Sequence, residues 1–300
     1  MTAWDRFWFA DGSGARLAVC RVLFYGGLLY TQRNLETAEW AEVDPMFWFP
    51  TALFSALRLS VPSATTLGAV VVLYQASLAL ACVGLFTRTA GWVAFVLGTY
   101  VIALPHNFGK VHHSDAILVF VLLALALSRM GDHGSIDALS RRLRRLEPAG
   151  PPRGGEYGWP IRFGQMASVI IYGAAGIAKV TASGLAWIAP SAFRNLLLYH
   201  HYTHEPTVDW GLYVAEMPWL CTAMAAMTML VETSAPLALF HRRLAATIIP
   251  LFAAMQLGIY LGLGVTFRPF LLLLPFWIPW DALTPAGRFG IRAASAQSTA

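Results

Sequence analysis

Charged side chains are scarce in this sequence, and their scarcity excludes an ordinary soluble domain. They make up 12% of the 300 residues, whereas hydrophobic residues make up 57%. Soluble domains contain about 25% charged residues. The mean hydropathy is +0.57, so the composition predicts a helical protein that crosses a membrane several times.

Cysteine and lysine are also rare. The three cysteines lie far apart in apolar segments without a C-x-x-C pair, which argues against a disulfide framework or a thiolate metal site. The only two lysines are Lys110 and Lys179, against nineteen arginines. This preference, together with abundant alanine, suggests a GC-rich bacterial genome.

Eight apolar runs predict an all-α membrane bundle of about eight transmembrane helices. The runs are 16–30, 64–86, 89–104, 114–129, 163–180, 213–240, 244–263 and 270–280. The last is short and is broken by Pro275 and Pro279. Several runs have fewer than about 20 residues, so flanking turns or local thinning of the bilayer would be needed for them to span.

The sequence predicts one transmembrane domain over residues 1–282, with an interfacial lead-in at 1–15. Residues 131–162 are expected to lie in the cytoplasm. They comprise an amphipathic helix at 135–146 and a linker at 147–158 that is rich in proline and glycine. The linker separates an amino half of four spans from a carboxyl half of four spans.

Arginines predict the orientation, because positive charge favours the cytoplasmic side. Five of them lie within 141–153, after the fourth span. With that loop inside, both termini and the arginines at 242–243 also fall inside. Residues 283–300 then form a cytoplasmic tail that is expected to be disordered. We therefore expect a multi-pass protein of the bacterial inner membrane.

The stretch from Tyr172 to Lys179, Y-G-A-A-G-I-A-K, combines small residues with a lysine. Small residues let membrane helices approach closely. The lysine either extends to the headgroups or serves a site. A lysine that is partly removed from water can act as a general base near neutral pH.

Six of the eight histidines fall on the predicted outer side, as Lys179 does. They are His106, His112, His113, His200, His201 and His204. The alternative to a catalytic role for His113 is an interfacial histidine bonded to a backbone carbonyl. The spacing of the last three resembles a metal-ligand pattern, but a single such box with few acids nearby does not predict a metal site.

Two further charges, Arg21 and Glu232, lie inside predicted spans. An isolated charge at mid-bilayer is costly, so partners are expected, and these two residues are a plausible pair. Such a pair would be either a structural bridge or part of an ion pathway. Pro236 would bend the sixth span just after Glu232.

Several short motifs occur in the order typical of one membrane family. They are R-V-L-F at 21–24, H-H-S at 112–114, S-I-D-A-L at 135–139, A-G-I-A-K at 175–179 and the segment 199–206. In these segments the chain resembles, over residues 16–280, the horizontally transferred transmembrane (HTTM) domain of vitamin K-dependent gamma-glutamyl carboxylases. The resemblance implies a short bacterial member without the carboxylase's lumenal domain.

The resemblance also implies a lysine base. The family's lysine at the position of Lys179 deprotonates reduced vitamin K, and its histidine at the position of His113 assists. Oxidation by O2 then produces a strong base that removes a proton from glutamate, and CO2 traps the carbanion. Lys179 and His113 are therefore the expected catalytic residues. Reduced vitamin K or another quinol is the expected cofactor, with O2 and CO2 as co-substrates and without a metal.

The remaining candidates are expected to bind the quinol. They are His112, His201, Tyr172, Arg21 and Glu232. The chain departs from the family pattern at Ala178, His200 and Gln256. These departures and the missing lumenal domain favour some other quinol-linked or peptide-modifying reaction over carboxylation of a clotting-type protein.

Membrane lipid and a secreted peptide or protein substrate are the expected partners, and nucleic acid is not. Two alternatives to an enzyme stay open. A non-catalytic scaffold or maturation partner for a secreted peptide predicts that Lys179 tolerates substitution and that the outer loops do not. A transporter that uses Arg21 and Glu232 predicts helices broken at mid-membrane, although the sequence shows no clear inverted repeat.

The predicted orientation can be tested with reporters fused after Ala300. A green fluorescent protein fused there should fluoresce, and an alkaline phosphatase fused there should be inactive, because the tail is expected in the cytoplasm. Phosphatase inserted after Gly109, in a predicted outer loop, is the control and should be active. An active phosphatase at the C-terminus would contradict the orientation.

Overall fold

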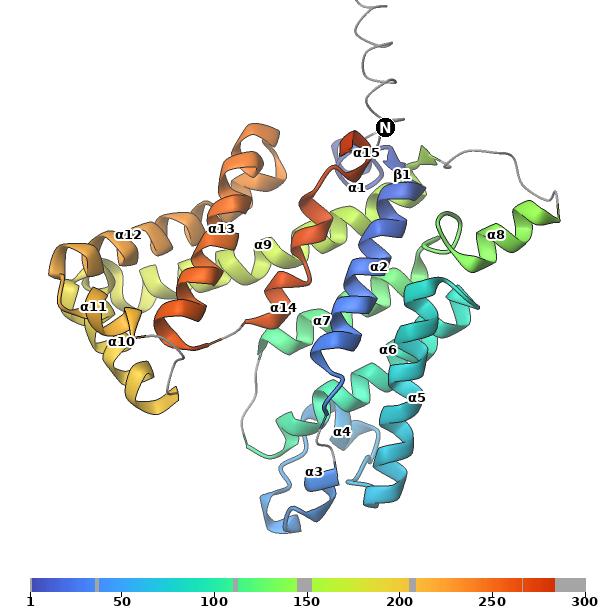
Figure 1. The fold of residues 1–300 in the computed structure, drawn as a ribbon, viewed down its shortest axis with the longest axis horizontal. Helices are drawn as coiled ribbons and strands as arrows, with labels where there is room; N and C mark the ends of the chain where they lie inside the picture. The colour runs from blue at the N-terminus through green and yellow to red at the C-terminus, as the bar shows by residue number, and fades with distance from the viewer. Residues whose placement is uncertain are drawn as a thin grey trace, which may run out of the picture. The chain divides into compact units, whose positions relative to one another are not determined.

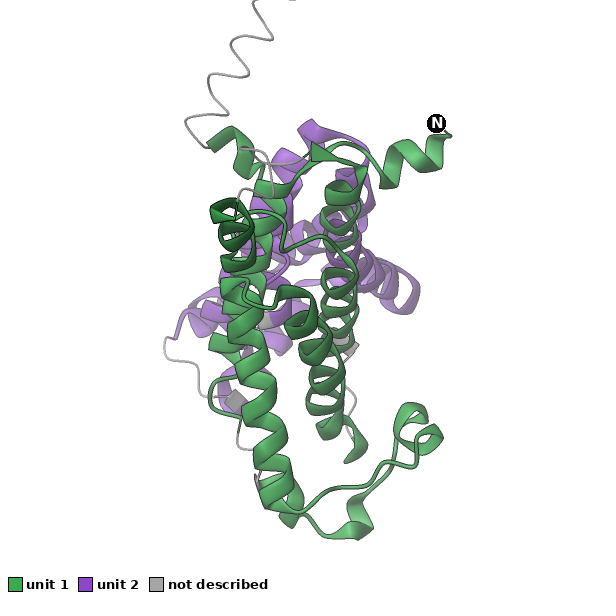
Figure 2. Cartoon of the chain, turned by 90° about the vertical axis from the view of Figure 1, so that its right-hand side faces the viewer, with its two compact units in different colours: residues 1–164, 278–300 green, residues 165–277 purple. Residues whose placement is uncertain are grey.

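The protein is described here from a computed structural model. The structure describes residues 2–35, 38–109, 113–144, 153–204, 209–265 and 267–283. Most of these residues are helical, and the one sheet among them pairs β1 (Gly12–Ser13) with β2 (Arg153–Gly154) in antiparallel register. The chain divides into two compact units, which Figure 2 colours separately: residues 1–164 with 278–300, and residues 165–277.

Five segments among the described residues are long and apolar enough to cross a membrane. They are Ala64–Val83, Thr87–Asn107, Gly155–Ile188, Pro218–Leu239 and Arg242–Leu263. These segments match the second, third, fifth, sixth and seventh predicted spans. The chain is therefore a helical protein with several candidate membrane spans, as its composition predicts, and the count of eight stays a prediction.

Four helices pack in succession in unit 1 (Figure 1). They are α2 (Gly14–Thr31), α5 (Ala64–Val83), α6 (Thr87–Ala103) and α7 (His113–Leu127). The shorter elements of this unit are α1 (Ala3–Trp8), α3 (Ala38–Glu42), η1 (Pro45–Phe47), α4 (Ala52–Ala56), η2 (Leu104–Asn107), α8 (Ile136–Leu143) and α15 (Trp280–Leu283). Ser13 caps the start of α2, because its hydroxyl accepts a hydrogen bond from the Ala15 backbone N–H at 3.1 Å.

Unit 2 contains the part of α9 (Gly155–Ser183) that follows Gly164. Its other elements are η3 (Gly184–Ile188), α10 (Pro190–His204), α11 (Trp210–Ala215), α12 (Pro218–Ser234), η4 (Ala235–Leu239), α13 (Arg242–Leu263), α14 (Arg268–Leu271) and η5 (Leu274–Trp277). Helix α10 packs against α11, α12 and α13.

Two predicted boundaries differ from the structure: the extent of the sixth span and the end of the linker. The sixth predicted span, 213–240, is not one helix: Pro218 starts α12 after a break that ends α11, and the span finishes as the 3-10 helix η4. The predicted linker is also too long, since residues 155–158 form the first turn of α9. Glycine is required there, because a Cβ atom at Gly158 would collide with the carbonyl oxygen of Ala10.

Arg21 is fully buried in unit 1 and binds the turn that follows α7. Its Nη1 donates to the carbonyl oxygen of Met130 at 2.7 Å, and its Nη2 donates to that of Gly134 at 2.6 Å. Carbonyls near a helix C-terminus lack partners within the helix and carry partial negative charge, so a guanidinium suits them. The predicted pairing of Arg21 with Glu232 is therefore wrong, because Arg21 binds carbonyl groups of its own unit.

Helix α8 is the predicted amphipathic helix, and Ser135 caps it by accepting from the Ala138 N–H at 2.9 Å. Asp137 ties it to the start of α6. The carboxylate accepts hydrogen bonds from the Phe86 N–H at 3.0 Å and from both the N–H and the hydroxyl of Thr87 at 2.7 Å. One carboxylate thus satisfies donors at the N-terminus of α6 and fixes α8 beside the α5–α6 turn.

The stability of unit 1 should depend on the charge of Asp137. Partial burial raises the pKa of its carboxyl, but hydrogen bonds from Thr87 and Phe86 and the charge of Arg141 outweigh burial and hold the pKa below its ordinary value. A depressed pKa stabilises the folded state above the unfolded pKa, about 3.9, and this contribution is lost as the pH falls through the folded value.

The unfolding temperature of the detergent-solubilised protein should therefore fall more steeply below about pH 4 than that of Asp137→Asn. Asp11→Asn, which changes an exposed carboxylate just before β1, is the control and should keep the wild-type slope. An equal slope for the wild-type protein and Asp137→Asn would refute the role given to this carboxylate.

Candidate functional site

An ion pair joins two candidate spans of unit 2. The Nζ of Lys179, on α9, lies 2.6 Å from the Oε2 of Glu232, on α12. The lysine side chain is 18% exposed and the glutamate side chain is 7% exposed. Because neither charge is fully hydrated, each depends on the other for stabilisation. Lys179 is thus paired within the protein, which argues against the interpretation that it only extends to the headgroups.

Gly176 brings α9 and α12 together at this pair. A Cβ atom at position 176 would lie 2.7 Å from the backbone nitrogen of Thr233 and 2.9 Å from the carbonyl carbon of Glu232, so only glycine permits this approach. Lys179 follows by three residues and lies on the same side of α9. The prediction that small residues in 172–179 allow close helix packing is confirmed.

Tyr172 lies on nearly the same face of α9, two helical turns before Lys179. Its ring stacks on Phe252 of α13 with the centroids 3.8 Å apart and an interplanar angle of 10°. Its hydroxyl accepts a hydrogen bond from the Nε2 of Gln256 at 3.1 Å. Both polar groups are buried, so the pair holds the ring in one position and leaves the hydroxyl hydrogen able to donate.

Trp187, in η3, borders the ion pair. The Nζ of Lys179 lies 5.2 Å from the centroid of its ring, within the range of a cation–π contact. The indole Nε1 is buried and has no hydrogen-bond partner among the described residues. A buried N–H without an acceptor is costly. The ammonium therefore lies beside an aromatic face, and the indole N–H is a buried donor that no described residue satisfies.

The predicted histidines are only partly described. His112 lies outside the described residues, and His113 is the first residue of α7 but its side chain is not described. His201 lies on α10 with its Nε2 3.9 Å from the Oδ1 of Asp209, and its buried Nδ1 has no hydrogen-bond partner in the described ranges. Convergence of the histidines with Lys179 therefore stays a prediction.

The structure pairs Lys179 with Glu232 and places Tyr172 two helical turns away on nearly the same face of α9. It adds two residues that were not predicted as site residues. Gln256 has a signal in the sequence, since it is a polar residue within the apolar run 244–263. Trp187 has no such signal in the sequence, because its position beside Lys179 depends on a turn at Gly184, where φ is +53°. Arg21 is not part of this site, because it binds the turn that follows α7 in unit 1.

The described residues contain no group of three or more histidine, cysteine, aspartate or glutamate side chains that could hold a metal ion. Comparisons of the chain with family models, with curated proteins and with solved structures gave no match. The resemblance to the HTTM domain thus rests on the motifs alone, and the chemistry of the site must be argued from its own side chains.

The close approach at Gly176 can be tested with a matched pair of substitutions. Gly176→Ala should lower the free energy of unfolding by about 1–3 kcal/mol, because the new methyl group must displace the α12 backbone. Gly258→Ala, on α13, has nothing within 4 Å of the new Cβ and should be neutral or stabilising by up to about 1 kcal/mol. Both values can be measured by denaturant titration in detergent, and equal values would show that the contact does not control packing.

Proposed function

We propose that this chain is a multi-pass enzyme of the bacterial inner membrane, of the HTTM class, that acts on a quinol with the Lys179–Glu232 pair as proton acceptor. In this proposal about eight segments span the membrane, both termini lie in the cytoplasm, and the pair opens towards the outer side. The observation that carries the proposal is the 2.6 Å ion pair between two candidate spans, beside a buried indole N–H.

A quinol fits the groups around Lys179. Its ring can lie against Trp187, and one of its oxygens can accept from the Lys179 ammonium. Its apolar tail suits a membrane helix that exposes Ile177 and Val180 near the lysine. When bound, a reduced quinol supplies an acidic hydroxyl and two electrons for O2.

Lys179 and Glu232 share one proton, and together they can accept a second proton from that hydroxyl. The shared proton can lie on the lysine, as an ion pair, or on the glutamate, as a neutral pair. Poor hydration disfavours the charged form and so brings the two forms closer in free energy than they are in water. From the neutral pair, the amine of Lys179 accepts the second proton, and the resulting ammonium compensates the negative charge left on the oxygen.

The assay uses the full-length protein in nanodiscs with reduced vitamin K, reduced menaquinone or reduced ubiquinone under O2. Chromatography of the remaining quinol should show faster loss than in empty nanodiscs. Lys179→Ala should slow that loss by at least about 10²-fold, because a positioned base contributes this much. Glu232→Gln, whose amide cannot take the shared proton from Lys179, should lower kcat more than it raises KM.

His113→Ala, which tests the partner that the resemblance implies, should also reduce the rate. Gly258→Ala, a conservative change on α13, is the control and should keep it. If no quinol is consumed above the background, the quinol proposal fails. If quinol is consumed at the wild-type rate by Lys179→Ala, the lysine is not the base. Unchanged cellular function in the lysine variant would favour the scaffold alternative.

A transporter is the second candidate, and the helix geometry after Glu232 favours it. Helix α12 ends at Ser234, and the candidate span continues as the 3-10 helix η4, with Pro236 in its first turn. Interrupted helices beside an intramembrane charge are typical of transporters. Proton or solute flux in proteoliposomes that requires Glu232, without quinol consumption, would decide for transport.

A further inference from the structure

Helix α8 is fixed where two candidate spans end. Helix α5 ends at Val83 and α6 begins at Thr87. The Asp137 backbone N–H donates to the Gly84 carbonyl oxygen at 3.0 Å, and its carboxylate binds the start of α6. Because a span ends where the hydrocarbon layer ends, these bonds hold α8 at the level of the membrane surface. This placement is the same whichever side of the membrane the turn occupies.

An apolar stripe runs along the outside of α8. Ile136, Leu139 and Leu143 are 44%, 57% and 77% exposed. At about 100° per residue these three positions share one face of the helix, and Arg142 and Arg144 flank that face on opposite sides. An exposed apolar stripe between two rows of arginine is typical of a helix that lies in the interface of an anionic membrane.

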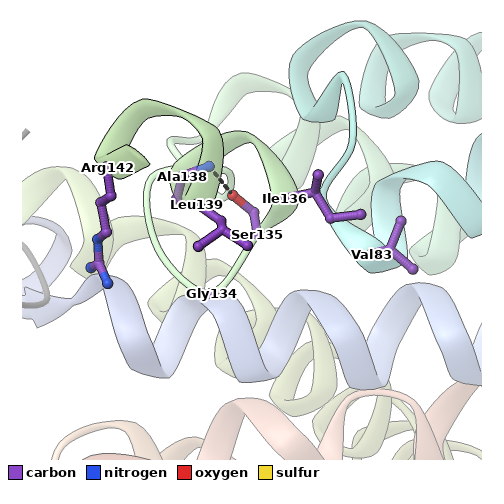
Figure 3. Close-up of a pocket in the computed structure, with 7 residues that line it drawn as sticks. All are labelled: Val83, Gly134, Ser135, Ile136, Ala138, Leu139 and Arg142. Atoms are coloured by element: carbon purple, nitrogen blue, oxygen red, sulfur yellow. Dashed lines mark hydrogen bonds between the residues drawn. The ribbon is translucent and has the colours of Figure 1, made fainter. Parts of the chain in front are cut away.

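A pocket of about 320 Å³ lies where this helix meets the end of α5. Its lining residues are Val83, Gly134, Ser135, Ile136, Ala138, Leu139 and Arg142. Figure 3 shows Val83 at one end of the group and Arg142 at the other. The volume lies in the range of small-molecule sites, about 300–1,000 Å³, and the lining is apolar apart from Ser135 and the one cation.

His133 holds the Arg142 side chain at the rim of the pocket. The Nη2 atom of Arg142 lies 3.1 Å from the Nδ1 atom of His133. Partial burial, Arg142 and Arg21 keep the pKa of His133 below its ordinary value, so the ring is neutral near pH 7 and its Nδ1 accepts from the guanidinium. A neutral histidine fixes the position of the guanidinium and does not cancel its charge.

We infer that this pocket binds an anionic phospholipid of the surrounding membrane. Its acyl chain would lie against Val83, Ile136 and Leu139, and its phosphate would accept from Arg142. The opposite charges of guanidinium and phosphate select an anionic lipid, because a zwitterionic headgroup brings its own cation and gains less from the arginine. The site belongs to unit 1 and is independent of the reaction proposed for Lys179.

The test uses the delipidated full-length protein in detergent. Native mass spectrometry should give a lower dissociation constant for phosphatidylglycerol than for phosphatidylcholine with the same acyl chains. Arg142→Gln should weaken the binding of phosphatidylglycerol by about fivefold, the effect of one arginine at a membrane surface, and weaken the binding of phosphatidylcholine by less. Arg144→Gln, which removes the same charge just after the last residue of α8 and does not line the pocket, is the matched control and should leave both constants unchanged.

Leu139→Ser provides a second variant, at an exposed position where the fold does not depend on the side chain, and it should weaken both lipids. Equal affinity of the wild-type protein for the two lipids would overturn the inference. So would an effect of Arg144→Gln as large as that of Arg142→Gln, because the attraction would then be diffuse. If Arg142→Gln does not fold, unchanged affinities in Leu139→Ser overturn the inference.

Discussion

A buried charge in an apolar bundle must have a partner, and this constraint organises both units. Arg21, Lys179 and Glu232 all lie on helices and are largely shielded from water. The two terminal nitrogens of Arg21 bind backbone carbonyls in the turn that follows α7, whereas Lys179 and Glu232 pair with each other. The first solution is directional and involves no proton exchange, because an arginine does not lose its proton in proteins. The second can exchange a proton, so it suits chemistry.

The geometry around Lys179 shows how packing prepares a site. Gly176 removes the side chain that would keep two backbones apart, and the lysine one turn later then reaches the neighbouring helix. The left-handed backbone at Gly184 turns the chain so that Trp187 lies beside the lysine. The cation, the carboxylate and the indole therefore come from three elements, and each is placed by a backbone feature rather than by a loop that could move.

Most helices and the amphipathic helix α8 could be predicted from the sequence, because apolar runs and alternating arginines follow directly from the contrast between lipid and water. The partners of the buried charged side chains could not be predicted from the sequence. Arg21 binds backbone carbonyls, and any residue could supply these, so the sequence carries no sign of them. The break before Pro218 was missed because a proline at the first turn of a helix and a proline inside a span look the same in a hydropathy profile.

The binding of Arg21 to the turn that follows α7 has a consequence for biogenesis. Arg21 precedes Met130 by 109 residues, so the ribosome makes the arginine long before the carbonyl groups that satisfy it. At about 5–20 residues per second, that interval lasts roughly 5–20 s. Until then, the guanidinium of Arg21 lacks the carbonyl groups that bind it in the folded structure. The first helix of the bundle to be synthesised therefore completes its contacts only after the α7–α8 turn has been made.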